Sequence, residues 1–167
     1  MKVIGLLSDT HTYLHPKIFD FFAGCNEIWH AGDIGNYETA AALAEFRPLR
    51  AVHGNIDGME VRSVYPKTQL FYCEDLKVMI THIGGYPGKY ESAAIPMIQK
   101  ERPGMFISGH SHILKVIYDQ KFQLLHINPG AAGKSGLHHV ITFVRFVVEG
   151  KNIRDLEIFE ADRSGHS

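Results

Sequence analysis

The stretch VIGLLSDTH, residues 3–11, passes from five small or apolar residues directly into four polar ones. A short apolar run that ends at polar residues is typical of a buried strand. The next segment, HPKIFDFFAG, places Ile18, Phe21 and Phe22 at helical spacing before Gly24. This part of the chain therefore predicts a strand, a polar loop and a helix, and that unit decides the fold of the N-terminal half.

The same unit recurs twice further along the chain. EIWHAGD (27–33) reads as a strand and a loop, YETAAALAEF (37–46) as an alanine-rich helix, and LRAVHGNID (49–57) as a strand and a loop. Strands that alternate with helices are typical of a parallel sheet, with the loops of successive units on one edge. The N-terminal half thus predicts a parallel inner sheet.

After Pro66 the pattern becomes richer in strands. TQLFYCED and LKVMITHI (68–83) predict a hairpin, the segment from Tyr90 to Glu101 a helix, and GMFISGH (104–110) another strand. Three later segments read as mostly antiparallel strands: residues 116–130, 139–150 and 153–162. We therefore expect an α/β fold forming one domain over residues 1–167, with the last residues, RSGHS, frayed.

Composition excludes several classes of function. The chain has 167 residues, 45% of them apolar, and a formal net charge of -1 with basic and acidic residues interspersed, so nothing indicates binding to nucleic acid or to an anionic membrane. Cys25 and Cys73 lack the close spacing of a redox or zinc motif. No apolar run approaches the roughly 20 residues of a membrane span. We expect a cytoplasmic protein with small-molecule chemistry.

Metal-capable side chains follow the predicted strands, which end in SDTH, HAGD, HGNID, THIGG and SGHSH. Residues two apart on an extended segment point the same way, so Asp9 with His11, and His110 with His112, would each face one centre. A single strand-end histidine is more often structural, but five such signals in order favour a shared site. The candidate ligands are Asp9, His11, Asp33, Asn55, His82, His110 and His112.

This donor set predicts two metal ions rather than one. Seven oxygen and nitrogen donors without a thiolate are too many for a structural zinc site. With one carboxylate shared and water added, they would complete two divalent ions about 3.5–4 Å apart. The shared group must be a carboxylate, because an anionic group with two oxygens can balance both ions whereas the neutral Asn55 amide serves one.

The ordered motifs DTH, GD, GNID, TH and GHSH closely resemble those of the calcineurin-like metallophosphoesterase superfamily. Its small prokaryotic phosphodiesterase branch, related to the small retromer subunit, is the most similar part, given the short connections and the INPGA segment at 127–131. The resemblance implies a four-layer α/β/β/α sandwich with mixed sheets. It also implies a phosphoric diester hydrolase that uses a water or hydroxide bridging two divalent metals.

Carried onto this sequence, the resemblance assigns Asp33 as the ligand that bridges the two metals. It implies that Asp33, Asn55 and His110 act in catalysis through the metals, and that no protein side chain serves as the nucleophile. We expect manganese from the mix of hard oxygen and imidazole ligands, with nickel, zinc or iron as alternatives. The resemblance also assigns Asp9, His11 and His112 to the first metal, and Asn55, His82 and His110 to the second. From their positions close to these ligands in the sequence, we expect His30, His53 and Asp57 to orient the ligands.

Five other histidines can have structural roles instead of roles at the metal site. His30 and His53 read equally well as hydrogen-bonded strand histidines. The other three, His126, His138 and His139, match no part of the motif, and we assign them structural roles.

Two positions depart from the family pattern. Ile56 stands where many members have a histidine proposed to protonate the leaving group, so we expect a preference for substrates with good leaving groups. THIGG replaces a common His-Gly-His, and the following loop offers Lys89 and Tyr86 as substrate contacts, with a solvated lysine as the alternative for Lys89. The sequence leaves open which group replaces the missing acid.

Three other functions compete with a diesterase acting on a small phosphodiester. A phosphomonoesterase ranks lower because an alkoxide is hard to expel without the histidine missing at Ile56, and a nucleotide pyrophosphohydrolase is a further alternative. A non-catalytic interaction scaffold, as the retromer subunit is regarded, is disfavoured, because clustering these imidazoles and carboxylates without a metal costs desolvation. The branch includes homo-oligomers, and the sequence leaves the oligomeric state open.

Overall fold

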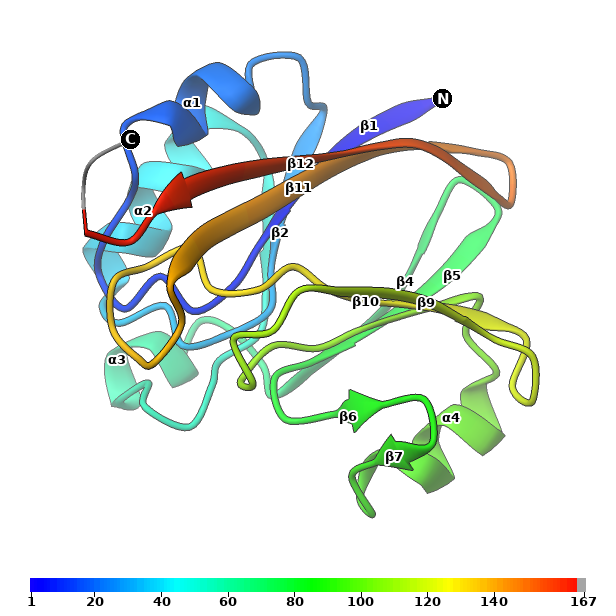
Figure 1. The fold of residues 1–167 in the computed structure, drawn as a ribbon. Coiled ribbons are helices and arrows are strands. Elements are labelled where there is room, and N and C mark those ends of the chain that lie inside the picture. The colour runs from blue at the N-terminus through cyan, green and yellow to red at the C-terminus, as the bar shows by residue number, and fades with distance from the viewer. Residues whose placement is uncertain (165–167) are drawn as a thin grey trace.

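The computed structural model describes residues 1–164, in which two five-stranded sheets pack face to face (Figure 1). The first sheet has the order β12-β11-β1-β2-β3 and the second β4-β5-β8-β10-β9. The strands of the first sheet are β1 (Lys2–Leu7), β2 (Glu27–His30), β3 (Leu49–Ala51), β11 (Val140–Glu149) and β12 (Asn152–Asp162). Those of the second are β4 (Thr68–Cys73), β5 (Leu76–Thr81), β8 (Met105–Ile107), β9 (Lys115–Asp119) and β10 (Leu124–Asn128).

Four helices and a small ribbon complete the described chain. The ribbon pairs β6 (Gly85–Tyr86) with β7 (Lys89–Tyr90), and the helices are α1 (Lys17–Phe21), α2 (Tyr37–Phe46), α3 (Met59–Arg62) and α4 (Ala94–Glu101). Figure 1 shows α1 and α2 beside the first sheet and α4 against the outer side of the second. Within residues 1–164, no helix is long and apolar enough to cross a membrane.

The alternation of side chains along the strands builds the layers. Ile4 of β1 enters the core between the sheets together with Val78 of β5, whereas Leu7 faces the other way and packs with Ile18 of α1. On the outer side of the second sheet, Met79 packs against α4. Because each sheet buries both faces, the molecule has four layers, and the predicted α/β/β/α sandwich with mixed sheets is confirmed.

Most predicted elements are present where expected. The strands β1, β2 and β3 are parallel, and β4 and β5 form the predicted hairpin. The helix α2 has its predicted bounds, and the Asn36 side chain caps it by accepting a hydrogen bond from the Thr39 amide at 2.9 Å.

Three sequence expectations need correction. The helix predicted from Tyr90 begins at Ala94, because Lys89–Tyr90 is drawn into the ribbon with Gly85–Tyr86. The strand β10 pairs with β9 in antiparallel fashion as expected but with β8 in parallel fashion. The short α3 was not predicted at all. The prediction of a frayed end concerns residues 163–167, of which 165–167 lie outside the described part.

The close packing of α1 on β1 can be tested at a glycine. A Cβ atom added to Gly5 would lie 2.7 Å from Phe22 Cδ1, so the Gly5→Ala variant should lose about 1–3 kcal/mol of unfolding free energy as the ring is displaced. Gly24→Ala is the matched control, because its added Cβ meets no heavy atom within 4 Å. Denaturant titration of both variants checks this, and equal stabilities would contradict the described contact.

Candidate metal centre

The loops that follow the strands bring the predicted ligands together at one edge of the sandwich. The loop after β1 carries two of them and the loop after β8 two more, while the loops after β2, β3 and β5 carry one each. Their donor atoms form two groups, each with all donors within 4.8 Å of one another. The first group is Asp9, His11 and His112, and the second is Asp33, His82 and His110.

Asp33 lies between the two groups. Its Oδ2 atom is 3.1 Å from His82 Nε2 in the second group and 3.6 Å from His11 Nε2 in the first. Its Oδ1 atom instead accepts a hydrogen bond from the backbone amide of Ile56 at 3.0 Å. A single carboxylate oxygen of Asp33 therefore faces both groups.

Asn55 and Asp9 complete the arrangement. The Oδ1 atom of Asn55 is 3.1 Å from His110 Nδ1, which places the amide beside the second group. Asp9 is fully buried, and its Oδ2 accepts hydrogen bonds from the Ser8 hydroxyl at 2.6 Å and the His110 amide at 3.2 Å. Asp9 Oδ1 remains directed at His112 Nε2, 3.2 Å away.

The unpaired atoms of this cluster fit divalent cations. Asp9 Oδ1, His11 Nε2 and His82 Nε2 are buried and have no hydrogen-bond partner in the described structure. Leaving a buried polar atom unpaired costs about 1–3 kcal/mol, so three of them beside one another would be unfavourable without a ligand. Imidazole nitrogen and carboxylate oxygen are donors that divalent transition metals bind.

The charges of the cluster also favour cations. Burial alone would raise the pKa of the Asp9 carboxyl, but His112 and His82 bring the pKa below its ordinary value. The Asp33 carboxyl behaves in the same way, because burial is outweighed by His82, and its pKa is also lowered. Both carboxylates are therefore ionised at neutral pH.

The backbone conformation explains how these side chains converge. Asp9, His11, Asp33, His110 and His112 all have positive φ, from 46° to 70°. This left-handed region is uncommon for residues other than glycine, and such strain tends to collect at functional sites. The expectation that pairs two apart on an extended chain face one centre is thus wrong in its reason, because β1 and β8 have already ended and left-handed turns aim the side chains. It is also wrong for one pair, since His110 and His112 belong to different donor groups.

Asp57 joins two of the ligand loops, as predicted for a residue that orients ligands. Its carboxylate accepts hydrogen bonds from the Ile34 amide at 3.2 Å, the Gly35 amide at 2.9 Å and the Gly54 amide at 2.8 Å. The first two amides belong to the loop that carries Asp33, and the third precedes Asn55. Asp57 therefore ties the loop that carries Asp33 to the loop that carries Asn55.

His30 connects the first two ligand loops. The Gly32 amide donates to its Nδ1 at 3.0 Å, so Nε2 carries the proton and donates to the Thr10 hydroxyl at 3.0 Å. Burial lowers the pKa of His30 to about 4, which keeps the ring neutral. His53, by contrast, donates from Nδ1 to the Tyr65 carbonyl at 2.9 Å, in keeping with the alternative of a hydrogen-bonded strand histidine.

Sequence reasoning missed the contact made by His138. Its Nδ1 lies 3.1 Å from Nδ1 of His112, although we expected a purely structural role. No spacing rule could reveal this pair, because 26 residues separate the two histidines. The backbone of the neighbouring segment contributes as well: the amides of Ala132 and Gly133 donate to the carbonyls of Ser8 and Asp9.

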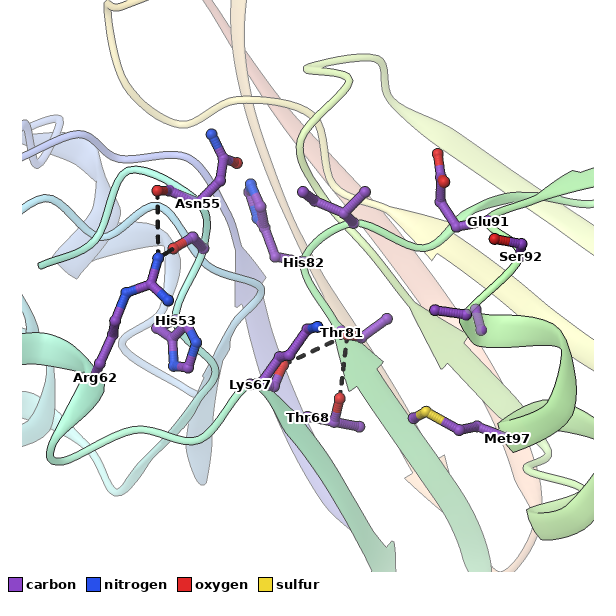
Figure 2. Close-up of a pocket in the computed structure, with 14 residues that line it drawn as sticks. His53, Asn55, Arg62, Lys67, Thr68, Thr81, His82, Glu91, Ser92 and Met97 are labelled. Atoms are coloured by element: carbon purple, nitrogen blue, oxygen red, sulfur yellow. Dashed lines mark hydrogen bonds between the residues drawn. The ribbon is translucent and has the colours of Figure 1, made fainter.

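Two pockets adjoin the second donor group. The larger of the two, of about 460 Å³, includes Asn55 and His82, and Figure 2 shows Arg62 and Lys67 on one side of it and Met97 on the other. The smaller, of about 270 Å³, includes His110 together with Lys89 and Tyr86, the two predicted substrate contacts. The residues Ile83 and Glu91 line both pockets.

A two-sheet sandwich with histidine and aspartate donors gathered at its strand ends defines a metallohydrolase type of site. The chain belongs to the calcineurin-like phosphoesterase superfamily, whose domain profile matches residues 1–151. Members of this family are phosphoesterases that generally bind divalent metals. The recognition made from the ordered motifs is therefore confirmed.

Individual proteins show the same relationship. A probable metallophosphoesterase of Methanocaldococcus jannaschii is 28% identical over 135 residues, covering 77% of this chain and 67% of that protein. A structure described as a novel archaeal phosphodiesterase is 23% identical with a TM-score of 0.72, covering 94% and 99% of the two chains. Vps29 of Entamoeba histolytica, solved in complex with Zn²⁺, is 17% identical with a TM-score of 0.72, covering 96% and 99%. At these identities the two structures support the fold alone.

The role of Asp57 can be tested through metal affinity. Asp57→Asn places an amide opposite three backbone N–H groups, so we expect a loss of about 1–3 kcal/mol of unfolding free energy and a 10–100-fold weaker affinity for Mn²⁺. Isothermal titration of metal-free protein checks the affinity. Asp20→Asn, at an exposed position on α1, should change neither quantity; unchanged affinity in Asp57→Asn would contradict the role.

Proposed function

We propose that this protein is a metal-dependent phosphodiesterase that hydrolyses a small phosphodiester at the seven-residue cluster. The observation that carries the proposal is the position of Asp33 Oδ2 between two groups of metal-capable donors. Asp9, His11 and His112 would hold one ion, Asn55, His82 and His110 the other, and Asp33 both. When bound, two divalent ions would neutralise charge on the phosphate and lower the pKa of a water toward neutrality.

The chain's own groups support hydrolysis by water rather than by a protein nucleophile. The Ser8 hydroxyl donates to Asp9, and the Thr10 hydroxyl donates to the Ile34 carbonyl at 2.9 Å, so neither points freely at a substrate. The Ser111 hydroxyl accepts from the Ile113 amide and the Asn128 side chain. Asp33 is held by the Ile56 amide, so its second oxygen is oriented before any ion binds.

The two pockets favour a diester over a monoester. A phosphodiester carries two organic substituents, and two pockets that share Ile83 each include donors of the second group. The larger of the two offers Ala93 and Met97 to an aromatic or other apolar ester group, with Arg62 and Lys67 beside them. The smaller offers Lys89 and Lys115 to a hydrophilic substituent.

A phosphomonoesterase is the second candidate, because Lys89 and Lys115 could bind the additional negative charge of a monoester. The side chain of Ile56, however, is 46% exposed beside the cluster and offers no proton to an alkoxide. A scaffold without metal is disfavoured by the three unpaired buried atoms at the centre of the site.

We also propose manganese as the activating ion and the cytoplasm as the compartment. Mixed oxygen and imidazole donors suit manganese, with zinc, nickel and iron as alternatives. Cys25 and Cys73 are buried free thiols, and burial raises the pKa of each to about 11, which suits reduced cysteines in a reducing compartment.

The bridging role of Asp33 predicts loss of both ions. Asp33→Asn removes the negative charge of an oxygen that lies within 3.6 Å of a histidine of each donor group, so metal content should fall from two ions per chain to one or fewer. Diesterase kcat/KM should fall by at least roughly 100-fold, the upper end of the losses that follow changes around a metal ligand. Elemental analysis and assays with added Mn²⁺ measure both. Asp20→Asn is the matched control, and two retained ions in Asp33→Asn would refute the assignment.

The missing leaving-group acid predicts a specific order of substrates. With Mn²⁺, an aryl diester such as bis(p-nitrophenyl) phosphate should be hydrolysed faster than an alkyl diester, and faster than p-nitrophenyl phosphate. Ile56→His supplies a general acid, worth about 100-fold or more, and should accelerate alkyl diesters much more than aryl diesters. Steady-state assays of both enzymes measure this ratio. A wild-type preference for monoesters would favour the second candidate.

A further inference from the structure

We propose that His138 is a positioning residue for the first donor group: it accepts the Nδ1–H of His112 and so leaves the Nε2 lone pair of His112 free for a metal ion. This inference rests on the proposed metal centre. His138 lies outside every motif that identifies the family in this sequence, and it comes from the segment that precedes β11.

The direction of the hydrogen bonds follows from a backbone carbonyl. His138 Nε2 lies 2.7 Å from the Gly133 carbonyl oxygen, which can only accept, so Nε2 carries a proton. In the neutral ring, Nδ1 of His138 is then a bare acceptor. It lies 3.1 Å from His112 Nδ1, which must therefore be the donor. A proton on Nδ1 of His112 leaves Nε2 as the nitrogen that can bind a metal.

The far side of the His112 ring faces the first donor group. His112 Nε2 is 3.2 Å from Asp9 Oδ1, one of the atoms without a hydrogen-bond partner. Two donor atoms at this separation can bind the same ion. The two histidine rings meet edge to face, with their centroids 4.9 Å apart and an interplanar angle of 81°, which brings the two Nδ1 atoms together.

The segment that carries His138 also fixes the other end of the same group. The Gly133 amide donates to the Asp9 carbonyl at 3.0 Å, while the Gly133 carbonyl accepts from His138. Gly136, at φ 127°, passes so close to the two rings that an added Cβ would lie 2.4 Å from His112 Nδ1 and 3.1 Å from His138 Nδ1. The loop that carries Gly133 and His138 therefore positions Asp9 through a backbone hydrogen bond and His112 through the side chain of His138.

His82 shows the same arrangement built from the backbone. Its Nδ1 lies 2.7 Å from the Ala31 carbonyl, which likewise directs Nε2 toward the donors of the second group. A backbone acceptor cannot be removed by substitution, whereas the acceptor for His112 is a side chain. The affinity of the first metal site alone should therefore depend on residue 138.

The first experiment is a Zn²⁺ competition titration of metal-free wild type and three variants. His138→Leu removes the acceptor and should weaken one of the two sites by about 10–100-fold, leaving the other unchanged. His138→Asn retains an acceptor near the Nδ1 position and should stay within about threefold of wild type. His139→Leu, at the exposed neighbouring residue, is the matched control and should have no effect.

The second experiment detects the hydrogen bond itself. In ¹⁵N-labelled, Zn²⁺-loaded wild type, a through-hydrogen-bond coupling should connect Nδ1 of His112 with Nδ1 of His138, a signature that a merely structural role would not produce. His138→Leu should lack it, and a protein spectrum otherwise like that of wild type shows that this variant is folded. Absence of the coupling in wild type would overturn the proposal.

The outcomes separate this inference from the proposed function. Two sites in wild type with equal affinities in His138→Leu would overturn the role of His138 and leave the metal centre intact. No Zn²⁺ binding by wild type would overturn both. Equal losses in His138→Leu, His138→Asn and His139→Leu would show a general effect of the loop and would also overturn the role of His138.

Discussion

The whole site depends on a backbone conformation that most side chains avoid. Five of the seven proposed ligands, Asp9, His11, Asp33, His110 and His112, are held at positive φ. Such residues cost of order 1–3 kcal/mol each, so the surrounding structure must hold them in place. Hydrogen bonds between adjacent loops do so: the amide of Asp9 donates to the Gly32 carbonyl at 2.9 Å, and that of His11 to the Asp33 carbonyl at 3.1 Å.

The polar network behind the donors is what makes this strain tolerable. His30 connects the Asp9 loop to the Asp33 loop, and Asp57 connects the Asp33 loop to the Asn55 loop. His138 contacts the ring of His112. None of these three residues points its polar atoms at the centre of the cluster. Fixing a metal ligand through such contacts preserves its orientation and its protonation state, and both are conditions for binding a cation tightly.

The surroundings of the donors decide what the centre can act on. Ile56 donates its backbone amide to Asp33 and exposes an apolar side chain, so this position orients the Asp33 carboxylate and offers no acid. Two pockets that share Ile83 adjoin the donors: one combines Ala93 and Met97 with Arg62 and Lys67, and the other includes Lys89 and Lys115.

The sequence by itself determined the family, the α/β alternation and the seven candidate donor positions. Apolar runs that end in Asp, Asn and His residues are local patterns, so they can be recognised without the three-dimensional structure. It could not determine the parallel pairing of β10 with β8, the shortening of α4 by the β6–β7 ribbon, or the left-handed turns at the strand ends. Nor could it find the contact of His138 with His112. These features arise from segments distant in sequence, whose hydrogen bonds and packing exist only once the two sheets and their loops have come together.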